Sequence, residues 1–458
     1  MVPACATPRT EQPTPVCVAP QAVTLVGTKT AALLVIASMI GTGVFTTTGL
    51  LVKDLGSPRA VLAAWIVGGL LALCGALSYA ELVAALPRNG GEYQLLGRVY
   101  HPAIGFAAGV ISVVVGFSAP LAASALAFGH YASRIVPGLS PVAAALGIVL
   151  LVAALHATSV PAGGRFQAIV TSVEVALIVL FVAAGLLLGS PSRVLVTGPA
   201  PVLSSLASPS FALSLIFVSF AYSGWNGAAY LAGEVRRPSR AIPIALLAGT
   251  ALVTALYVAL NAVFLSSAPL SDLTGVVEVG HVAAVKLLGD GAGRLVSVVI
   301  ALVLASSVSA MLMAGPRVCE AMGVDHPRLA FLAYRTRKGG PAAAVALQAA
   351  LAVAMVLTSS FGALLSYVGF TLSLIAGLTV LGVIVLRLRE PRLGRPYKTW
   401  GYPATPLLFV ALSTWMAWHA LLENPASSWI GLATITFALA SYAVLGRGHR
   451  RVTRRPSP

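Results

Sequence analysis

Charged residues are scarce in this sequence. Only 9% of its 458 residues are Asp, Glu, Lys or Arg, whereas 58% are hydrophobic, and the mean hydropathy is +0.92. A soluble domain needs about 25% charged residues to cover its surface. The composition therefore excludes an ordinary soluble protein, and the surplus of apolar side chains must face lipid.

Cysteine and clustered histidine are also lacking. The four cysteines show neither metal-ligand spacing nor a disulfide pattern. No apolar segment groups the His, Asp and Glu residues that a membrane-embedded enzyme needs, and no repeated channel filter is present. We therefore expect a protein that is not an enzyme and that has no metal, no cofactor and no catalytic residue.

Long apolar runs are what the sequence has in abundance. About twelve runs reach roughly 18 to 28 residues, and about 20 helical residues cross a ~30 Å hydrocarbon core. Backbone groups in lipid must be satisfied within the segment, so the runs predict an all-α polytopic membrane protein. The predicted spans are 30–52, 60–86, 102–129, 141–160, 166–189, 211–233, 241–267, 295–315, 342–360, 361–386, 403–422 and 428–446.

Lys and Arg are distributed unequally between the two sides of these spans. Of the 29 basic residues, 23 fall on the side of the termini and 6 on the other. Because basic loops stay in the cytoplasm, both termini are predicted to be cytoplasmic. Residues 1–27 are expected to be a disordered tail without a signal peptide, and residues 447–458 a basic tail. The net charge of +16 then reflects topology rather than nucleic-acid binding.

Two spans contain residues that disfavour an unbroken helix. The first span has Gly41, Thr42 and Gly43 at mid-depth, and the sixth has a polar, Gly-flanked patch at 222–227. Small residues also allow helices to pack closely, which is the alternative explanation for each segment. The two segments hold corresponding positions in five-helix units, a pattern typical of inverted-repeat transporters.

An unwound segment at membrane depth exposes backbone N–H groups on one side and C=O groups on the other. The N–H groups suit a carboxylate, and the carbonyls suit an ammonium group or a cation. A zwitterionic amino acid matches both. A core with few charged side chains is therefore compatible with a charged substrate.

Five segments together resemble the amino acid–polyamine–organocation superfamily, especially bacterial and L-type amino acid permeases. They are IGTGVF at 40–45, YAELVAALPRNGGEY at 79–93, FAYSGWNGAAYLAGEVRRPSRAIP at 220–243, AGPRV at 314–318 and RPYKTWGYPATPLLF at 395–409. The resemblance implies a leucine-transporter-like fold with discontinuous helices one and six. It also implies repeats at about 28–190 and 208–390, and extra helices at about 403–446.

The resemblance further implies where the substrate binds. The amides of Thr42 and Gly43 would hold the carboxylate, carbonyls near both breaks would hold the amine, and Phe220 would be an aromatic gate. The implied substrate-binding set is Met39, Ile40, Gly41, Thr42, Gly43, Phe220, Ala221, Ser223 and Gly224.

Glu174 stands where many relatives carry a lysine in the fifth span. It lies roughly 12 Å into that span, and an ionisable residue at such depth is a functional candidate. One interpretation is proton or sodium coupling, with the Ser306, Ser307 and Ser309 hydroxyls around it. The alternative is a neutral, structural carboxylic acid, since burial favours the protonated form.

Other acidic residues lie near the cytoplasmic ends of spans. We expect Glu81 to anchor the loop at 90–93. Glu234 is expected either to pair with Arg236, Arg237 and Arg240 or to be simply solvated.

The sequence thus predicts a secondary active transporter that moves amino acids, with neutral ones favoured, as a symporter or exchanger in the cell membrane. Its partners would be the substrate and the lipid bilayer. Polyamine or organic-cation transport on the same fold is the main alternative. A major-facilitator exporter is less favoured, because the loop after the second span lacks that family's acidic-basic signature.

Overall fold

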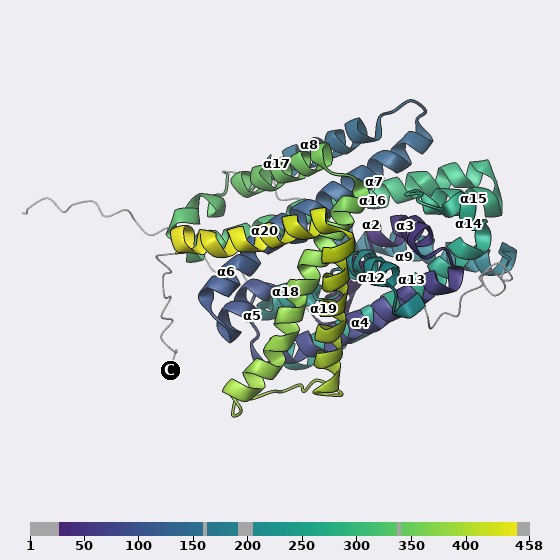
Figure 1. Cartoon of the computed structure of the whole chain (residues 1–458). Coiled ribbons are helices and arrows are strands. Elements are labelled where there is room, and N and C mark those ends of the chain that lie inside the picture. Colours follow the sequence, from purple (N-terminus) through teal and green to yellow (C-terminus); the bar gives the residue numbers. More distant parts are fainter. Residues whose placement is uncertain (1–26, 159–162, 191–204, 337–339, 447–458) are drawn as a thin grey trace, which may run out of the picture.

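The computed structural model describes residues 27–158, 163–190, 205–336 and 340–446, and every regular element within these ranges is a helix. The predicted tails, apart from Gly27, lie outside the described residues. Eight of the described helices are long and apolar enough to cross a membrane, and further apolar helices are shorter. The chain is therefore a polytopic α-helical protein of the membrane type (Figure 1).

The helices of the first half follow the predicted spans closely. They are α1 (Thr28–Met39), α2 (Thr42–Thr46), α3 (Thr48–Leu55), α4 (Pro58–Ala85), α5 (Gly91–Val99), α6 (Pro102–Ile111), η1 (Ser112–Ser118), α7 (Ala119–Ile135), α8 (Pro141–Thr158) and α9 (Gly163–Leu188).

The second half begins with an interrupted helix and then runs through longer ones. Its elements are α12 (Pro209–Tyr222), η2 (Gly227–Glu234), α13 (Pro238–Ser267), α14 (Leu270–Leu273), α15 (Val279–Leu288), α16 (Asp290–Asp325), η3 (Pro327–Ala333), α17 (Ala342–Thr358), α18 (Phe361–Arg389), α19 (Ala404–Glu423), α20 (Pro425–Ser441) and η4 (Tyr442–Gly446).

Local sequence explains where several helices begin. The hydroxyls of Ser57, Ser208 and Ser360 each accept a hydrogen bond from a backbone N–H in the first turn of α4, α12 and α18. A proline follows Ser57 and Ser208 at the first helical position, where its missing N–H costs nothing. Polar caps therefore fix the residues at which these apolar helices begin.

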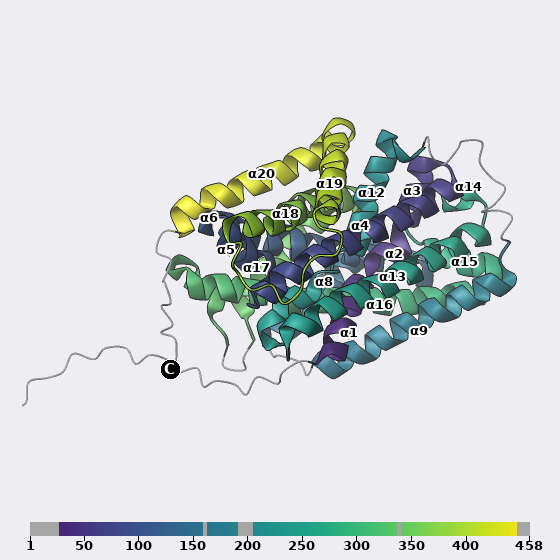
Figure 2. The same ribbon diagram turned by 90° about the horizontal axis from the view of Figure 1, so that it is seen from below.

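The helices pack so that the two halves of the chain interleave. In particular, α13 packs along both α1 and α4, and α16 packs along α7. Figures 1 and 2 show α18 and α19 side by side, and α8 beside α17 is clearest in Figure 1. Only two residues separate α17 from α18, as the abutting apolar runs predict. This interleaving brings the interrupted helices together.

Three helices outside the predicted spans join the long ones. Residues in α5 alternate between apolar and polar at helical spacing, and α14 and α15 are short, so a search for long apolar runs passes over them. The helix α16 is also longer than predicted and has 36 residues.

The predicted role of Glu81 is wrong. Its carboxylate accepts two hydrogen bonds from the Arg387 guanidinium, at 2.8 and 2.7 Å, and one from the backbone N–H of Thr399 at 2.7 Å. Glu81 therefore anchors the C-terminal end of α18 and the segment after it, and not the loop at 90–93. Because Arg387 lies far away in the sequence, only the tertiary packing of α4 on α18 pairs the two charges.

A second charged cluster lies between the C-terminal end of α7 and the start of α15. The buried Glu278 carboxylate is 3.5 Å from His130 Nδ1 and 3.4 Å from Arg134 Nε. Burial raises the pKa of Glu278, but its bond with His130 and the nearby Arg134 charge outweigh this effect. The pKa therefore lies below its ordinary value of 4.5.

Candidate functional site

The first predicted span is interrupted where its glycines lie. Helix α1 ends at Met39 and α2 begins at Thr42, and the backbone between them is extended, with ψ 117° at Ile40 and φ −173° at Gly41. We call residues 40–41 the first break. The helix beyond it is nearly continuous to Leu55, because Thr47 keeps helical angles between α2 and α3. The amides of its first turn have no side-chain cap, since the capping position is Gly41.

The sixth predicted span is interrupted in the same way. Helix α12 ends at Tyr222, and a 3-10 helix starts at Gly227. We call residues 223–226 the second break. Gly224 has φ +97°, a left-handed conformation that favours glycine, and Ser223 is extended with ψ 147°. The backbone requirement at Gly224 accounts for the glycine at this position.

The two breaks lie against each other. A Cβ atom added to Gly43 would overlap the backbone and side chain of Ala221, and one added to Gly224 would overlap the Ser38 carbonyl. A Cβ on Gly227 would lie 2.8 Å from Ser38 Oγ. Glycine is thus needed for close approach of the two interrupted helices. The structure brings predicted site residues from both halves into contact.

A tyrosine that the sequence analysis missed connects the first break to α13. The Tyr257 hydroxyl donates a 2.6 Å hydrogen bond to the Met39 carbonyl, so one lone pair of that oxygen is already used. Tyr257 is fully buried, and its ring packs against Trp65 and Tyr222. The sequence could have pointed to Tyr257, because it lies in the middle of an apolar span and a buried tyrosine hydroxyl requires a hydrogen-bond partner.

Glu174 is buried in α9 and lies within electrostatic range of Tyr257. Its Oε2 atom has no hydrogen-bond partner among the described residues. Glu174 therefore neighbours the side chain that holds the Met39 carbonyl.

The serines predicted to surround Glu174 separate into different environments. Ser307 Oγ would be 3.5 Å from a Cβ atom on Gly41, so Ser307 lies beside the first break. The Ser306 hydroxyl is buried without a hydrogen-bond partner among the described residues. Ser309 Oγ is 2.8 Å from Nε2 of His156 and is occupied there.

Hydroxyl groups connect the helix after the first break to its neighbours. Thr42 Oγ1 is hydrogen-bonded to Ser124 Oγ of α7, and the Thr48 hydroxyl donates to Asn261 Oδ1 of α13. On the same helix, the Phe45 carbonyl accepts a 2.9 Å bond from the Tyr131 hydroxyl. These contacts join the interrupted helix to both α7 and α13.

Beneath the second break lies a buried carboxylate that sequence reasoning did not single out. Glu92 Oε1 accepts from Tyr79 Oη at 2.9 Å and from Asn226 Nδ2 at 2.5 Å. The Trp225 ring packs edge-on against Tyr79, with ring centroids 4.8 Å apart. The short helix α5 therefore ties the second break to α4 through Glu92.

Phe220 is buried in α12 with 5% of its surface exposed, one residue before Ala221 in the contact between the breaks.

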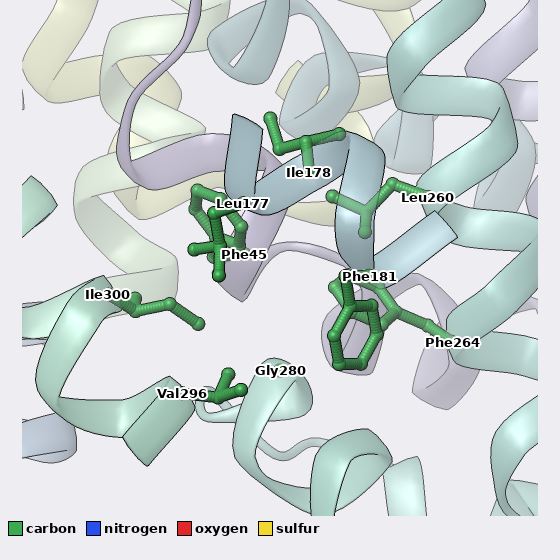
Figure 3. A pocket seen from close by; sticks show the side chains of 9 residues that line it. All are labelled: Phe45, Leu177, Ile178, Phe181, Leu260, Phe264, Gly280, Val296 and Ile300. Atoms are coloured by element: carbon green, nitrogen blue, oxygen red, sulfur yellow. The ribbon is translucent and has the colours of Figure 1, made fainter. Parts of the chain in front are cut away.

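A separate small cavity lies between α2, α9, α13, α15 and α16, and Figure 3 shows apolar side chains pointing into it. Its volume is ≈ 10 Å³, enough for about one water molecule. No amino acid fits this cavity.

Among the described residues, Glu234 forms no ion pair with Arg236, Arg237 or Arg240. Its Oε1 accepts from Asn89 Nδ2 at 3.2 Å, and Asn89 Oδ1 accepts from the Gly233 amide at 2.8 Å. The side chain is partly exposed. Of the two predicted alternatives, the structure agrees with solvation, to which the Asn89 amide adds one hydrogen bond.

Two interrupted apolar helices from the two halves of a polytopic membrane protein thus lie in contact at their interruptions. A family model described as amino acid permease matches residues 26–445, which is nearly the whole chain. The chain belongs to the amino acid permease family.

Relatives of known activity cover most of the chain. The serine/threonine exchanger SteT of Bacillus subtilis is 28% identical over 405 residues, which are 86% of this chain and 90% of that protein. Human large neutral amino acids transporter small subunit 2 is 27% identical over 427 residues, 91% of this chain and 79% of that protein. Mouse Asc-type amino acid transporter 1 is 26% identical over 420 residues, which are 90% of this chain and 79% of that protein.

Proposed function

We propose that this protein is a secondary transporter of neutral amino acids and works by exchange or symport. The observation that supports it is the contact between the two breaks, where Gly43 lies on Ala221 and Gly224 lies on Ser38. Family membership and the transport activities named for the relatives point the same way. The paired breaks supply opposite partial charges within one site.

The substrate binds with its carboxylate at the start of the helix that follows the first break. The amides of Thr42 and Gly43 there have no side-chain cap. The ammonium group binds carbonyls of Ile40, Ala221 and Ser223. The Met39 carbonyl contributes less than the sequence implied, because Tyr257 already donates to it.

In this proposal the chain crosses the membrane twelve times with both termini in the cytoplasm. Residues 28–190 and 208–390 form two inverted repeats, and 403–446 add two helices. The four predicted spans beyond the eight long helices correspond to α8, α9, α12 and α17, where the apolar stretches are the shorter segments Pro141–Ala157, Ser172–Leu188, Pro209–Tyr222 and Ala342–Thr358. The 23-to-6 distribution of basic residues supports the orientation.

Glu174 couples transport to a proton or cation in this proposal. It is buried, one of its oxygens is unpartnered among the described residues, and it neighbours Tyr257, which holds the first break. Glu174→Gln keeps the shape and removes the ionisation. We expect this variant to exchange amino acids while losing the response of uptake to pH or to sodium. An unchanged response would exclude Glu174 from coupling.

Counterflow in reconstituted liposomes tests the function itself. The full-length protein is assayed with a panel of labelled amino acids, with and without a pH gradient and with sodium on either side. Saturable exchange of neutral amino acids is the expected result. Movement of polyamines or other organic amines, without exchange of any amino acid, would overturn the substrate assignment.

A further inference from the structure

Three arginines surround an open hollow where α13 begins. The hollow has a volume of ≈ 550 Å³ and is lined by Gly27, Thr28, Arg236, Arg237, Arg240, Ala241 and Ile244. This is within the ~300–1,000 Å³ of ligand pockets. Arg237 has φ 51°, a left-handed conformation that is rare for a side-chain-bearing residue, and it caps α13. Two of the three arginines thus lie just before α13 and the third lies in its first turn, and all three line the hollow.

No acidic side chain in the described part of the chain is paired with this cluster, although Glu234 lies two positions before Arg236. Among the described residues, none of Arg236, Arg237 and Arg240 forms an ion pair within 4.0 Å. The part of the chain outside the description contains one acidic residue, Glu11, and residues 1–26 also contain Arg9. The side chains of residues 1–26 therefore carry no net negative charge.

Exposed apolar side chains continue directly from the arginines along α13. Ile244 follows Arg240 by one turn and is 46% exposed, and Leu252 lies two turns further and is also 46% exposed. On the neighbouring helix α1, exposed Leu33 follows exposed Lys29 by one turn. Figure 2 shows α1 near α13, and the two helices pack together. The arginines would match the charged head group of a phospholipid, and the exposed apolar strip formed by Ile244 and Leu252 would match its acyl chain.

We propose that this hollow binds the phosphate of an anionic membrane lipid, with the guanidinium groups on the head group and an acyl chain along Ile244 and Leu252. Guanidinium groups bind phosphate oxygens through paired, charge-assisted hydrogen bonds. Basic pockets between membrane helices bind anionic head groups in this way. The apolar strip is the reason to choose a lipid over a free anion.

Binding to purified full-length protein in a neutral detergent tests the site. The probes are short-chain phosphatidylglycerol, short-chain phosphatidylcholine and inorganic phosphate, and the readouts are the apparent affinity and the shift in thermal unfolding midpoint. The variant replaces Arg236, Arg237 and Arg240 by Gln, and Arg240→Gln alone serves if the triple variant does not fold. The matched control replaces Arg450, Arg451 and Arg454 by Gln, which removes the same net charge from the C-terminal tail.

We expect phosphatidylglycerol to bind and phosphatidylcholine not to bind. Affinity should fall about fivefold for each arginine removed, and roughly a hundredfold for all three, while the tail control keeps wild-type affinity. Equal weakening in the hollow and tail variants, or no weakening in the hollow variant, would overturn the site. Inorganic phosphate binding as tightly as phosphatidylglycerol would overturn the lipid assignment. None of these results depends on amino acid transport.

Discussion

Gly41 lies in the first break and Gly43 lies two residues later in α2, and the structure predicts opposite outcomes when each is replaced by alanine. A Cβ atom on Gly41 meets Ser307 Oγ at 3.5 Å, an ordinary contact, and the extended backbone there accepts any residue. A Cβ atom on Gly43 overlaps the Ala221 backbone, so helix α12 must move. The first substitution should therefore affect transport alone, and the second should affect folding as well.

The expected magnitudes follow from these contacts. Overpacking at Gly43→Ala costs about 1–3 kcal/mol of stability, which should lower the thermal unfolding midpoint in detergent. Gly41→Ala should leave that midpoint near wild type. Its methyl group narrows the approach to the break, and a lost hydrogen bond to a carboxylate costs about 1.5–3 kcal/mol. That loss corresponds to a fall of at least about tenfold in exchange at low substrate concentration.

The assay measures amino acid counterflow and thermal unfolding on the same preparations of both variants. Wild-type exchange by Gly41→Ala would refute the position of the substrate at the first break. Wild-type stability of Gly43→Ala would refute the close contact between the two breaks. The two results are independent, so one can fail without the other.

Three further substitutions test other parts of the structure. Tyr257→Phe removes the donor to the Met39 carbonyl and keeps the ring. We expect it to lower the free energy of unfolding by about 1 kcal/mol and to reduce amino acid exchange more than this small change in stability explains. Unaltered counterflow would argue against Tyr257 in the site. Glu81→Gln leaves Arg387 without its charge partner and should cost about 3 kcal/mol, so an unshifted unfolding midpoint would contradict the pairing. The pKa of Glu278 is below 4.5, so its charge stabilises the fold above pH 4.5, and this stabilisation disappears as the pH falls through the lowered pKa. Glu278→Gln should therefore cost about 1 kcal/mol at neutral pH and nothing in strong acid, and a pH-independent difference would contradict this assignment.

The helix interruptions were predictable because their causes are local. Gly224 has the left-handed backbone of the second break, and Gly41 and Gly43 disfavour a helix at the first, so both interruptions are visible in the sequence itself. The caps at Ser57, Ser208 and Ser360 are also local interactions, because each hydroxyl accepts from a backbone N–H only three residues further along the chain. The short helix α5 escaped prediction because it has no long apolar run.

The partners of buried polar groups were not predictable in the same way. Glu81 was assigned to a nearby loop, yet it bonds Arg387, which is 306 positions away. The Tyr257 bond to Met39 spans 218 positions. A sequence shows that a buried carboxylate or phenol needs a partner, but many partners at such separations are chemically equivalent.

The sequence by itself determined the environment of the chain, the positions of most membrane helices and the two places where a helix is interrupted. Each of these depends on composition or on neighbours a few residues apart. Only the tertiary structure decided that Gly43 meets Ala221, that Tyr257 holds the Met39 carbonyl and that three arginines share one hollow. Those outcomes depend on which helices pack together, and apolar helix surfaces that are all similarly hydrophobic do not encode that choice locally.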